Sequence, residues 1–136
     1  MNYYAFAHID IVPYNAALML KELGFDEQCF FNYRKVTVTD YKTGDSSEPI
    51  IYLDKMNFTM NYNESNNEYD ASAPMFSQAF RFFREKYGVH MFPEKFDEKT
   101  WWVEWGYWNS SIFDTYEEAE LECLMKMIEI IKNETK

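Results

Sequence analysis

The aromatic chemistry of this sequence is concentrated in one short stretch, residues 101–108 (WWVEWGYW), which holds all four tryptophans of the chain. Indole rings can stack on a planar ligand, a sugar or a side chain of a partner protein, and they can equally fill a hydrophobic core. We predict a strand over 100–108, in which successive side chains point to opposite faces. The role of each tryptophan therefore depends on the face that it takes.

This predicted strand has two different faces. One face is uniformly apolar and is predicted to be core: Trp101, Val103, Trp105 and Tyr107. The other face is mixed: Trp102, Glu104, Gly106 and Trp108. In a continuous strand Trp102 and Trp108 lie roughly 20 Å apart, too far for one small ligand to be held between them. Trp102, Glu104 and Trp108 are therefore candidate partner-binding residues, although packing of both tryptophans under a helix or loop stays open.

Histidine and cysteine are sparse, and their spacing does not favour a metal or a catalytic site. His8, His90, Cys29 and Cys123 are far apart in the sequence and form no CxxC or HxxxH pair. The GxSxG, GxGxxG, HExxH and Walker A motifs are absent. We therefore predict no catalytic residue, no cofactor and no metal. Both cysteines are interpreted as reduced residues of the core.

Acidic residues outnumber basic ones, 23 to 13, which gives a formal net charge of −10. This charge disfavours direct contact with nucleic-acid phosphates and with anionic membrane surfaces, and it favours a basic protein partner. Glu118, Glu122 and Glu129 recur on one side of a predicted helix and form a candidate acidic surface. A solvated helix face is the simpler interpretation. An array of carboxylates that imitates the phosphates of DNA is the alternative.

The elements that position these side chains predict an α+β fold, with one domain over 1–136 and a small, mostly antiparallel sheet packed by about three helices. Apolar periodicity and end signals predict helices over 14–23 and 74–88, and a third after Thr115, which has capping-box spacing to Glu118. The apolar stripe of the third helix is Leu121, Leu124, Met125, Ile128 and Ile131. Strands are predicted over 29–33, 36–41, 50–53, 56–62, 89–92, 100–108 and 112–113. A flexible polar loop is predicted over 62–73.

Three stretches occur in an order that resembles small proteins encoded by phages and prophages of gut Bacteroides-type bacteria: LKELGFDEQCFF, APMFSQAFRFFREKYG and TYEEAELECLMKMIEIIK. Their motifs are structural, namely caps, core positions and a glycine stop, and they cover about a third of the chain. That group has no assigned activity, so no functional residue is carried over. The resemblance implies a mobile element, the cytoplasm of a bacterial host and host-directed binding.

The leading hypothesis is a non-enzymatic, intracellular, acidic binding protein of a phage or mobile element that acts through protein–protein contact or self-association. A cytoplasmic location is expected, because the first residues lack signal-peptide features and no segment is long enough to cross a bilayer. One alternative is a small-ligand-binding protein or enzyme with an aromatic pocket. A second alternative is a DNA-mimic inhibitor of a nucleic-acid-binding protein.

Overall fold

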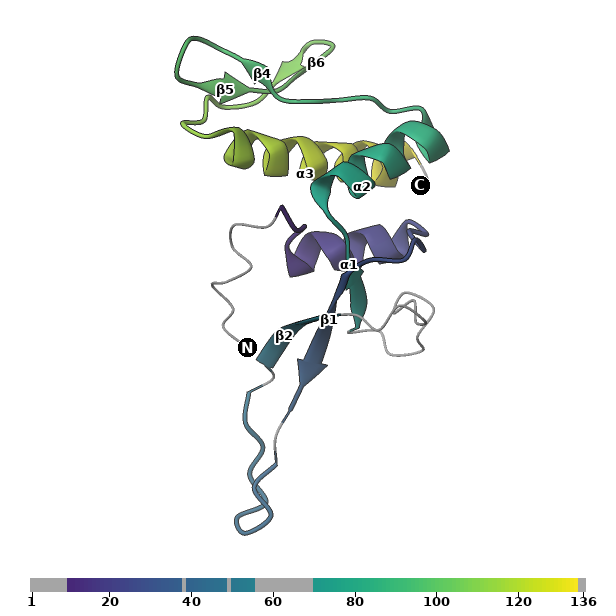
Figure 1. The fold of residues 1–136 in the computed structure, drawn as a ribbon, viewed down its shortest axis with the longest axis vertical. Helices are drawn as coiled ribbons and strands as arrows, with labels where there is room; N and C mark the ends of the chain where they lie inside the picture. Colours follow the sequence, from purple (N-terminus) through teal and green to yellow (C-terminus); the bar gives the residue numbers. More distant parts are fainter. Residues whose placement is uncertain (1–9, 38, 49, 56–69, 135–136) are drawn as a thin grey trace. The chain divides into compact units, whose positions relative to one another are not determined.

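The computed structural model describes residues 10–37, 39–48, 50–55 and 70–134 (Figure 1). The helices are α1 (Tyr14–Glu22), α2 (Phe76–Phe82), the π-helix η3 (Phe83–Tyr87) and α3 (Tyr116–Glu134). The strands are β1 (Phe31–Val36), β2 (Ile50–Lys55), β3 (Ala71–Ala73), β4 (Glu94–Lys95), β5 (Trp101–Trp102), β6 (Glu104–Trp105) and β7 (Trp108–Asn109). Helices combined with small antiparallel sheets confirm the predicted α+β class.

The chain divides into two compact units, residues 1–75 and 76–136. Unit 1 contains α1 and a three-stranded sheet of order β2-β1-β3. Unit 2 contains α2, η3 and α3 together with two two-stranded sheets, β4-β5 and β6-β7. One cooperative domain over 1–136 stays a prediction.

The sheet of unit 1 is built around β1, which pairs antiparallel with both neighbours. Tyr33 lies opposite Leu53 on one side and Ala71 on the other, and all three side chains are buried. The Tyr33 hydroxyl donates to the carbonyl of Val12 at 2.7 Å, and its ring meets the edge of Tyr14 at 5.4 Å between centroids. Tyr33 therefore fixes the central strand to the residues that lead into α1.

Helix α1 ends in a motif that depends on glycine. Gly24 has a φ of 92°, a left-handed conformation that glycine adopts without steric cost. Its N–H donates to the carbonyl of Lys21 at 3.0 Å, and the N–H of Phe25 donates to Leu20 at 2.9 Å. This pair of bonds is the Schellman arrangement, which satisfies the last carbonyls of a helix. The predicted helix and its glycine stop are confirmed.

The second predicted helix changes type half-way. The α-helical turns of α2 continue as η3, where the N–H of Gly88 donates to the carbonyl of Phe83, five residues earlier. Such π turns are wider than α turns and are rare. Phe82 and Phe83 are consecutive and both buried, with ring centroids 5.4 Å apart. Gly88, with a φ of 68°, ends the element as predicted.

Helix α3 carries the predicted apolar stripe and packs against α2 and β5 within unit 2. Its buried side chains include Cys123, Leu124, Met127, Ile128 and Ile131, whereas Leu121 and Met125 are half-buried at the margins of the stripe. The N–H of Glu118 donates to Thr115 Oγ1 at 3.2 Å, which confirms half of the predicted capping box. The carboxylate of Glu118 accepts the Thr115 hydroxyl at 2.9 Å, where a capping box has it accept the Thr115 backbone N–H.

Among the described residues of 29–41 the structure has one strand, β1, instead of the two predicted. β1 ends at Val36, and the chain then turns, with Asp40 N–H donating to Asp45 O at 2.7 Å and Gly44 N–H donating to Asp40 O at 2.8 Å. The β-branched alternation of 36–41 was a misleading signal, because local turn bonds around Asp40 take the place of a strand ladder. Thr39 forms an isolated bridge with Ser46 there.

Other predicted boundaries also differ. β2 confirms the strand at 50–53 and extends it to Lys55. Residues 89–92 form no strand. The polar loop predicted over 62–73 is wrong at its end, because 71–73 form β3 and are buried between neighbours of the sheet and α1. Asp70 is described and belongs to no strand. Residues 62–69 of the predicted loop and the strand predicted over 56–62 lie outside the described residues.

Candidate functional site

The tryptophan stretch is not one strand but three short ones. β5 pairs with β4, so that Trp101 lies opposite Lys95, and β6 pairs with β7, so that Trp105 lies opposite Trp108. Val103 separates β5 from β6 and is fully buried. These short strands lie along one side of α3 in Figure 1. The break at Val103 and the reversal after β6 overturn the prediction of a continuous strand over 100–108.

Gly106 and Tyr107 form the two-residue turn of the β6–β7 hairpin, which we define as residues 104–109. Gly106 has a φ of 60°, as expected for a hairpin turn with glycine in its first position. Residues paired directly across a hairpin share a face, and neighbours along a strand do not. Trp108 therefore shares a face with Trp105 and not with Glu104. The predicted common face of Trp102, Glu104 and Trp108 is wrong for this reason, and the continuous strand from which their separation was derived is not formed.

The prediction that Trp105 and Tyr107 lie in the core is also wrong. Trp105 is 40% exposed and Tyr107 is 110% exposed. The reversal at Gly106 places both residues at the free end of the hairpin, whereas the strand periodicity placed them beside Val103. Only Val103, from the predicted core face, is fully buried, and Trp101 is half-buried.

Trp101 is held from several sides. It exchanges two backbone hydrogen bonds with Phe113, at 2.9 and 2.8 Å, so the predicted return strand at 112–113 is reduced to a single bridge. The Lys95 ammonium lies 5.5 Å from the centroid of the Trp101 ring. The ring of Tyr116 meets Trp101 edge-on at 5.1 Å. Trp101 is therefore a structural residue that joins β4, β5 and the start of α3.

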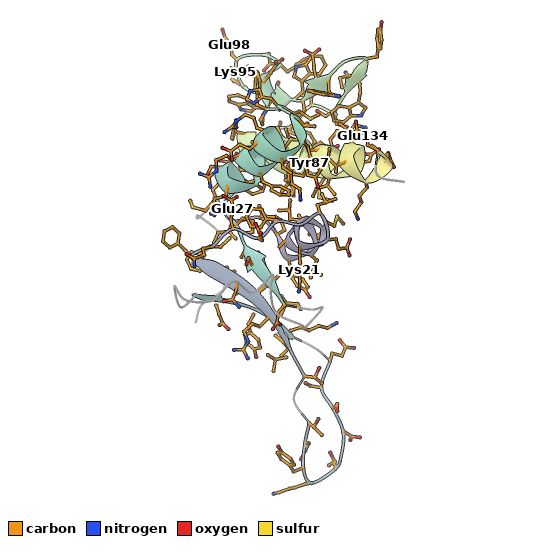
Figure 2. The ribbon with its side chains drawn as sticks, turned by 90° about the vertical axis from the view of Figure 1, so that its right-hand side faces the viewer. Lys21, Glu27, Tyr87, Lys95, Glu98 and Glu134 are labelled. Carbon is orange, nitrogen blue, oxygen red and sulfur yellow. The ribbon has the colours of Figure 1, made fainter. Side chains whose placement is uncertain are left out.

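Trp102 points to the other face of β5 and packs against Phe96, with centroids 4.9 Å apart and planes at 72°. Phe96 begins a turn whose centre is Asp97. The Asp97 carboxylate accepts the N–H groups of Lys99 and Thr100, both at 2.8 Å, and the Thr100 hydroxyl at 2.7 Å. These bonds, that of Lys99 first, lower the pKa of Asp97. Glu98, labelled in Figure 2, lies in this turn.

Trp108 lies beside the acidic surface predicted on α3. The Lys126 ammonium is 4.7 Å from the centroid of the Trp108 ring and 3.5 Å from Glu129 Oε1. Glu122 and Glu118 are four and eight residues before Lys126, which places them on the same side of the helix. We call Glu118, Glu122 and Glu129 the acidic face of α3. The structure thus brings two predicted sites together through Lys126.

The base of the β6–β7 hairpin is held by Ser110, which was not predicted to matter. The N–H of Val103 donates to Ser110 Oγ, and the N–H of Ser110 donates to the Val103 carbonyl, both at 2.8 Å. The Ser110 hydroxyl in turn donates to the carbonyl of Ser111 at 2.7 Å. Ser110 and Val103 are both buried, so these bonds fix the position from which the hairpin projects.

Both cysteines are buried free thiols, as predicted. Burial raises the pKa of Cys29 and of Cys123 to about 12, with smaller contributions from the charges of Glu27 and Glu120, respectively. A thiol with so high a pKa stays protonated at neutral pH and is a poor nucleophile. The two cysteines are therefore core residues and not candidates for chemistry.

Comparisons of the chain with models of known protein families, with curated proteins and with solved structures find no match. In the part of the chain that the structure describes, no three His, Cys, Asp or Glu side chains gather as a metal ion requires. Over the same residues, no helix combines the length and the apolar character needed to span a bilayer. The chemistry of the site is that of its own residues, which are exposed aromatic rings next to carboxylates.

Proposed function

We propose that this chain is a non-enzymatic, intracellular binding protein of a phage or mobile element, and that the β6–β7 hairpin is its contact with a protein partner. The observation that carries the proposal is the exposure of Trp105 and Tyr107 at the end of this hairpin. Tryptophan and tyrosine are the residues that contribute most binding energy in protein interfaces, where a partner covers them. The setting in a mobile element rests on the resemblance of the three sequence stretches.

The hairpin is also suited to binding because its base is fixed. Ser110 and Val103 hold its start, and Lys126 covers Trp108 from α3. A side chain presented on a pre-organised element loses less conformational entropy when it binds. The two exposed rings can therefore contribute to affinity without a large ordering cost.

The other two candidate residues have secondary places in this proposal. Glu104 is exposed and stands next to Trp105, on the opposite face of the hairpin. Trp102 is half-buried against Phe96, and Phe96 is itself 47% exposed. Trp102 would therefore act by supporting Phe96 at the margin of the contact.

The acidic face of α3 gives less support to a DNA-mimic function. Lys126 lies between Glu122 and Glu129 on that face and forms an ion pair with Glu129. A cation in the row interrupts the regular series of negative charges that a phosphate mimic needs. A protein contact that uses aromatic rings together with carboxylates fits this arrangement better.

The test compares four proteins: wild type, Trp105→Ala, Tyr107→Ala and the matched control Tyr41→Ala. Tyr41 is 101% exposed and lies in a turn of unit 1, so its removal deletes an equally exposed ring elsewhere. Each protein is cross-linked in a bacterial lysate, and its captured proteins are quantified by mass spectrometry. Sedimentation velocity on the purified proteins measures self-association.

We expect a captured protein, or a self-associated species, that both hairpin variants lose and Tyr41→Ala keeps. Thermal melts should be nearly unchanged for Tyr107→Ala, because a fully exposed side chain contributes little to the core. If all four proteins give the same capture and the same sedimentation, the hairpin is not the contact and the proposal fails.

A further inference from the structure

We infer that the protein partner offers a cationic segment, and that an arginine or lysine of this segment lies on the indole ring of Trp105. This inference rests on the proposed function of the β6–β7 hairpin and specifies the chemistry of its partner. Three observations carry it, concerning the neighbouring tryptophans, the distribution of charge and the side of the hairpin on which Trp105 lies.

Two tryptophans of this stretch already have a lysine over the ring. Lys95 lies over Trp101 at 5.5 Å, and Lys126 lies over Trp108 at 4.7 Å. The face of an indole ring is the strongest cation acceptor among the aromatic side chains. Among the described residues, no lysine or arginine lies over Trp105, although it is 40% exposed. The indole face of Trp105 can therefore accept a cation as those of Trp101 and Trp108 do, and we infer that another molecule supplies this cation.

The charge around these rings favours a cation. Residues 94–122 contain nine acidic side chains: Glu94, Asp97, Glu98, Glu104, Asp114, Glu117, Glu118, Glu120 and Glu122. The same segment contains two basic side chains, Lys95 and Lys99, so its formal net charge is −7. The basic residues before it, Arg81, Arg84 and Lys86, belong to α2 and η3. The segment of unit 2 that contains the tryptophans is thus acidic, and its field attracts a basic segment.

The indole ring of Trp105 lies on the side of the hairpin that faces the acidic residues of α3. Trp105 and Trp108 share a face, and Trp108 meets Lys126 of α3 on that face. A cation on Trp105 would therefore lie on the side of the hairpin that is turned to the acidic face of α3. Lys126 occupies one cation position on this side and is neutralised by Glu129. The partner would supply a second cation, which would lie over Trp105 as Lys126 lies over Trp108.

The probe for this inference is a short fluorescent peptide of alternating arginine and glycine, and its matched control has glutamine in place of each arginine. Fluorescence anisotropy at near-physiological salt measures binding to wild type, Trp105→Phe, Trp105→Leu and Glu48→Gln. Trp105→Phe keeps an aromatic face, whereas Trp105→Leu keeps an apolar side chain without one. Glu48→Gln removes one exposed carboxylate from unit 1, whereas the hairpin belongs to unit 2. Melting curves show which variants are folded.

We expect the arginine peptide to bind wild type and Glu48→Gln equally, and Trp105→Leu about tenfold more weakly, the size of effect expected of a partly desolvated cation–π pair. Trp105→Phe should keep most of the affinity, and the glutamine peptide should not bind. Equal binding to Trp105→Leu and wild type would mean nonspecific attraction to an acidic protein, and absence of binding would mean that the site takes no cation. Either result overturns the inference.

These failures are separable from a failure of the proposed function. If the arginine peptide does not bind but Trp105→Ala still loses a captured protein, the hairpin is a contact for an uncharged partner. If Trp105→Ala instead abolishes self-association, the occupant is a second copy of the chain. In both cases the proposed function stands and the cationic partner is rejected. If no variant changes capture or sedimentation, the proposed function itself is wrong.

Discussion

Lys126 of α3 lies over the indole ring of Trp108, and this contact ties the β6–β7 hairpin to the helix. The ammonium group lies 4.7 Å from the centroid of the indole ring, and the Lys126 side chain is only 17% exposed. The same ammonium lies 3.5 Å from Glu129 Oε1, which neutralises its charge. A cation this sheltered interacts with a ring more strongly than an exposed one.

Replacement of Lys126 by methionine should lower the free energy of unfolding by about 0.5–2 kcal/mol, because it removes the cation and keeps the apolar length of the side chain. Lys126→Arg should keep most of the stability, since guanidinium also stacks on indole. Urea melts followed by tryptophan fluorescence measure both variants. Equal stability of Lys126→Met and wild type would show that the lysine contributes packing by its carbon chain alone.

Ser110→Ala should destabilise the protein by about 1–3 kcal/mol, because the buried N–H of Val103 loses its hydrogen-bond acceptor. The matched control is Ser111→Ala, next in the chain, whose side chain is exposed and should be nearly silent. Circular dichroism melts of the two variants provide the comparison. If the two variants have the same melting temperature, the Ser110 hydroxyl does not stabilise the base of the hairpin.

Thr115→Ala should cost about 0.5–2 kcal/mol, as the loss of a helix N-cap does. Thr115→Ser keeps the oxygen that accepts the Glu118 N–H and should stay close to wild type. Hydrogen exchange of the first-turn amides of α3, alongside urea melts, locates the effect. A Thr115→Ser variant as unstable as Thr115→Ala would assign the stability to the threonine methyl group and not to the cap.

Stability should fall as the pH rises above 9, because burial raises the pKa of both thiols from 9.0 to about 12. Between these values the unfolded chain has released its thiol protons and the folded chain has kept them. The free energy of unfolding then decreases with pH, by up to about 1.4 kcal/mol per pH unit for each thiol. Below pH 9 the contribution is fully present.

The control for this pH dependence is Cys123→Ala, which removes one of the two thiols and leaves the tyrosines and lysines that also titrate. Urea melts in steps through this pH range should give a shallower decline for the variant than for wild type. Parallel declines would mean that the Cys123 thiol titrates alike in the folded and unfolded chains, contrary to its burial.

The parts of the fold that could be predicted from the sequence are those with strictly local causes. Gly24 and Gly88 end helices because only a residue without a side chain takes their left-handed conformation at low cost. Thr115 and Glu118 are three residues apart, so a cap could be expected from spacing alone. The α3 stripe follows from helical periodicity, and Leu124 and Ile128 are buried as expected.

The parts that could not be predicted depend on competition between two local signals. Along 101–108 the strict alternation favoured one long strand, and a Gly-Tyr pair inside it favoured a turn. The turn prevails, and this choice moves Trp105 from core to surface and separates Glu104 from Trp108. The contact of Lys126 with Trp108 had no signal in the sequence, because it depends on how the hairpin meets the helix.

The π turn of η3 has a consequence for how this chain tolerates changes in length. Each π hydrogen bond spans one residue more than an α bond, so residues 83–87 hold one residue in excess of a regular helix. Deletion of a single residue here would restore ordinary helical winding, without breaking the chain on either side. Such a deletion would also keep Gly88 near its present angle around the helix axis, because four residues of an α-helix turn through about the same angle as five residues of a π-helix. Loss of one residue within 83–87 should therefore be tolerated better than loss of one residue inside α3, which would turn the rest of that helix by about 100°.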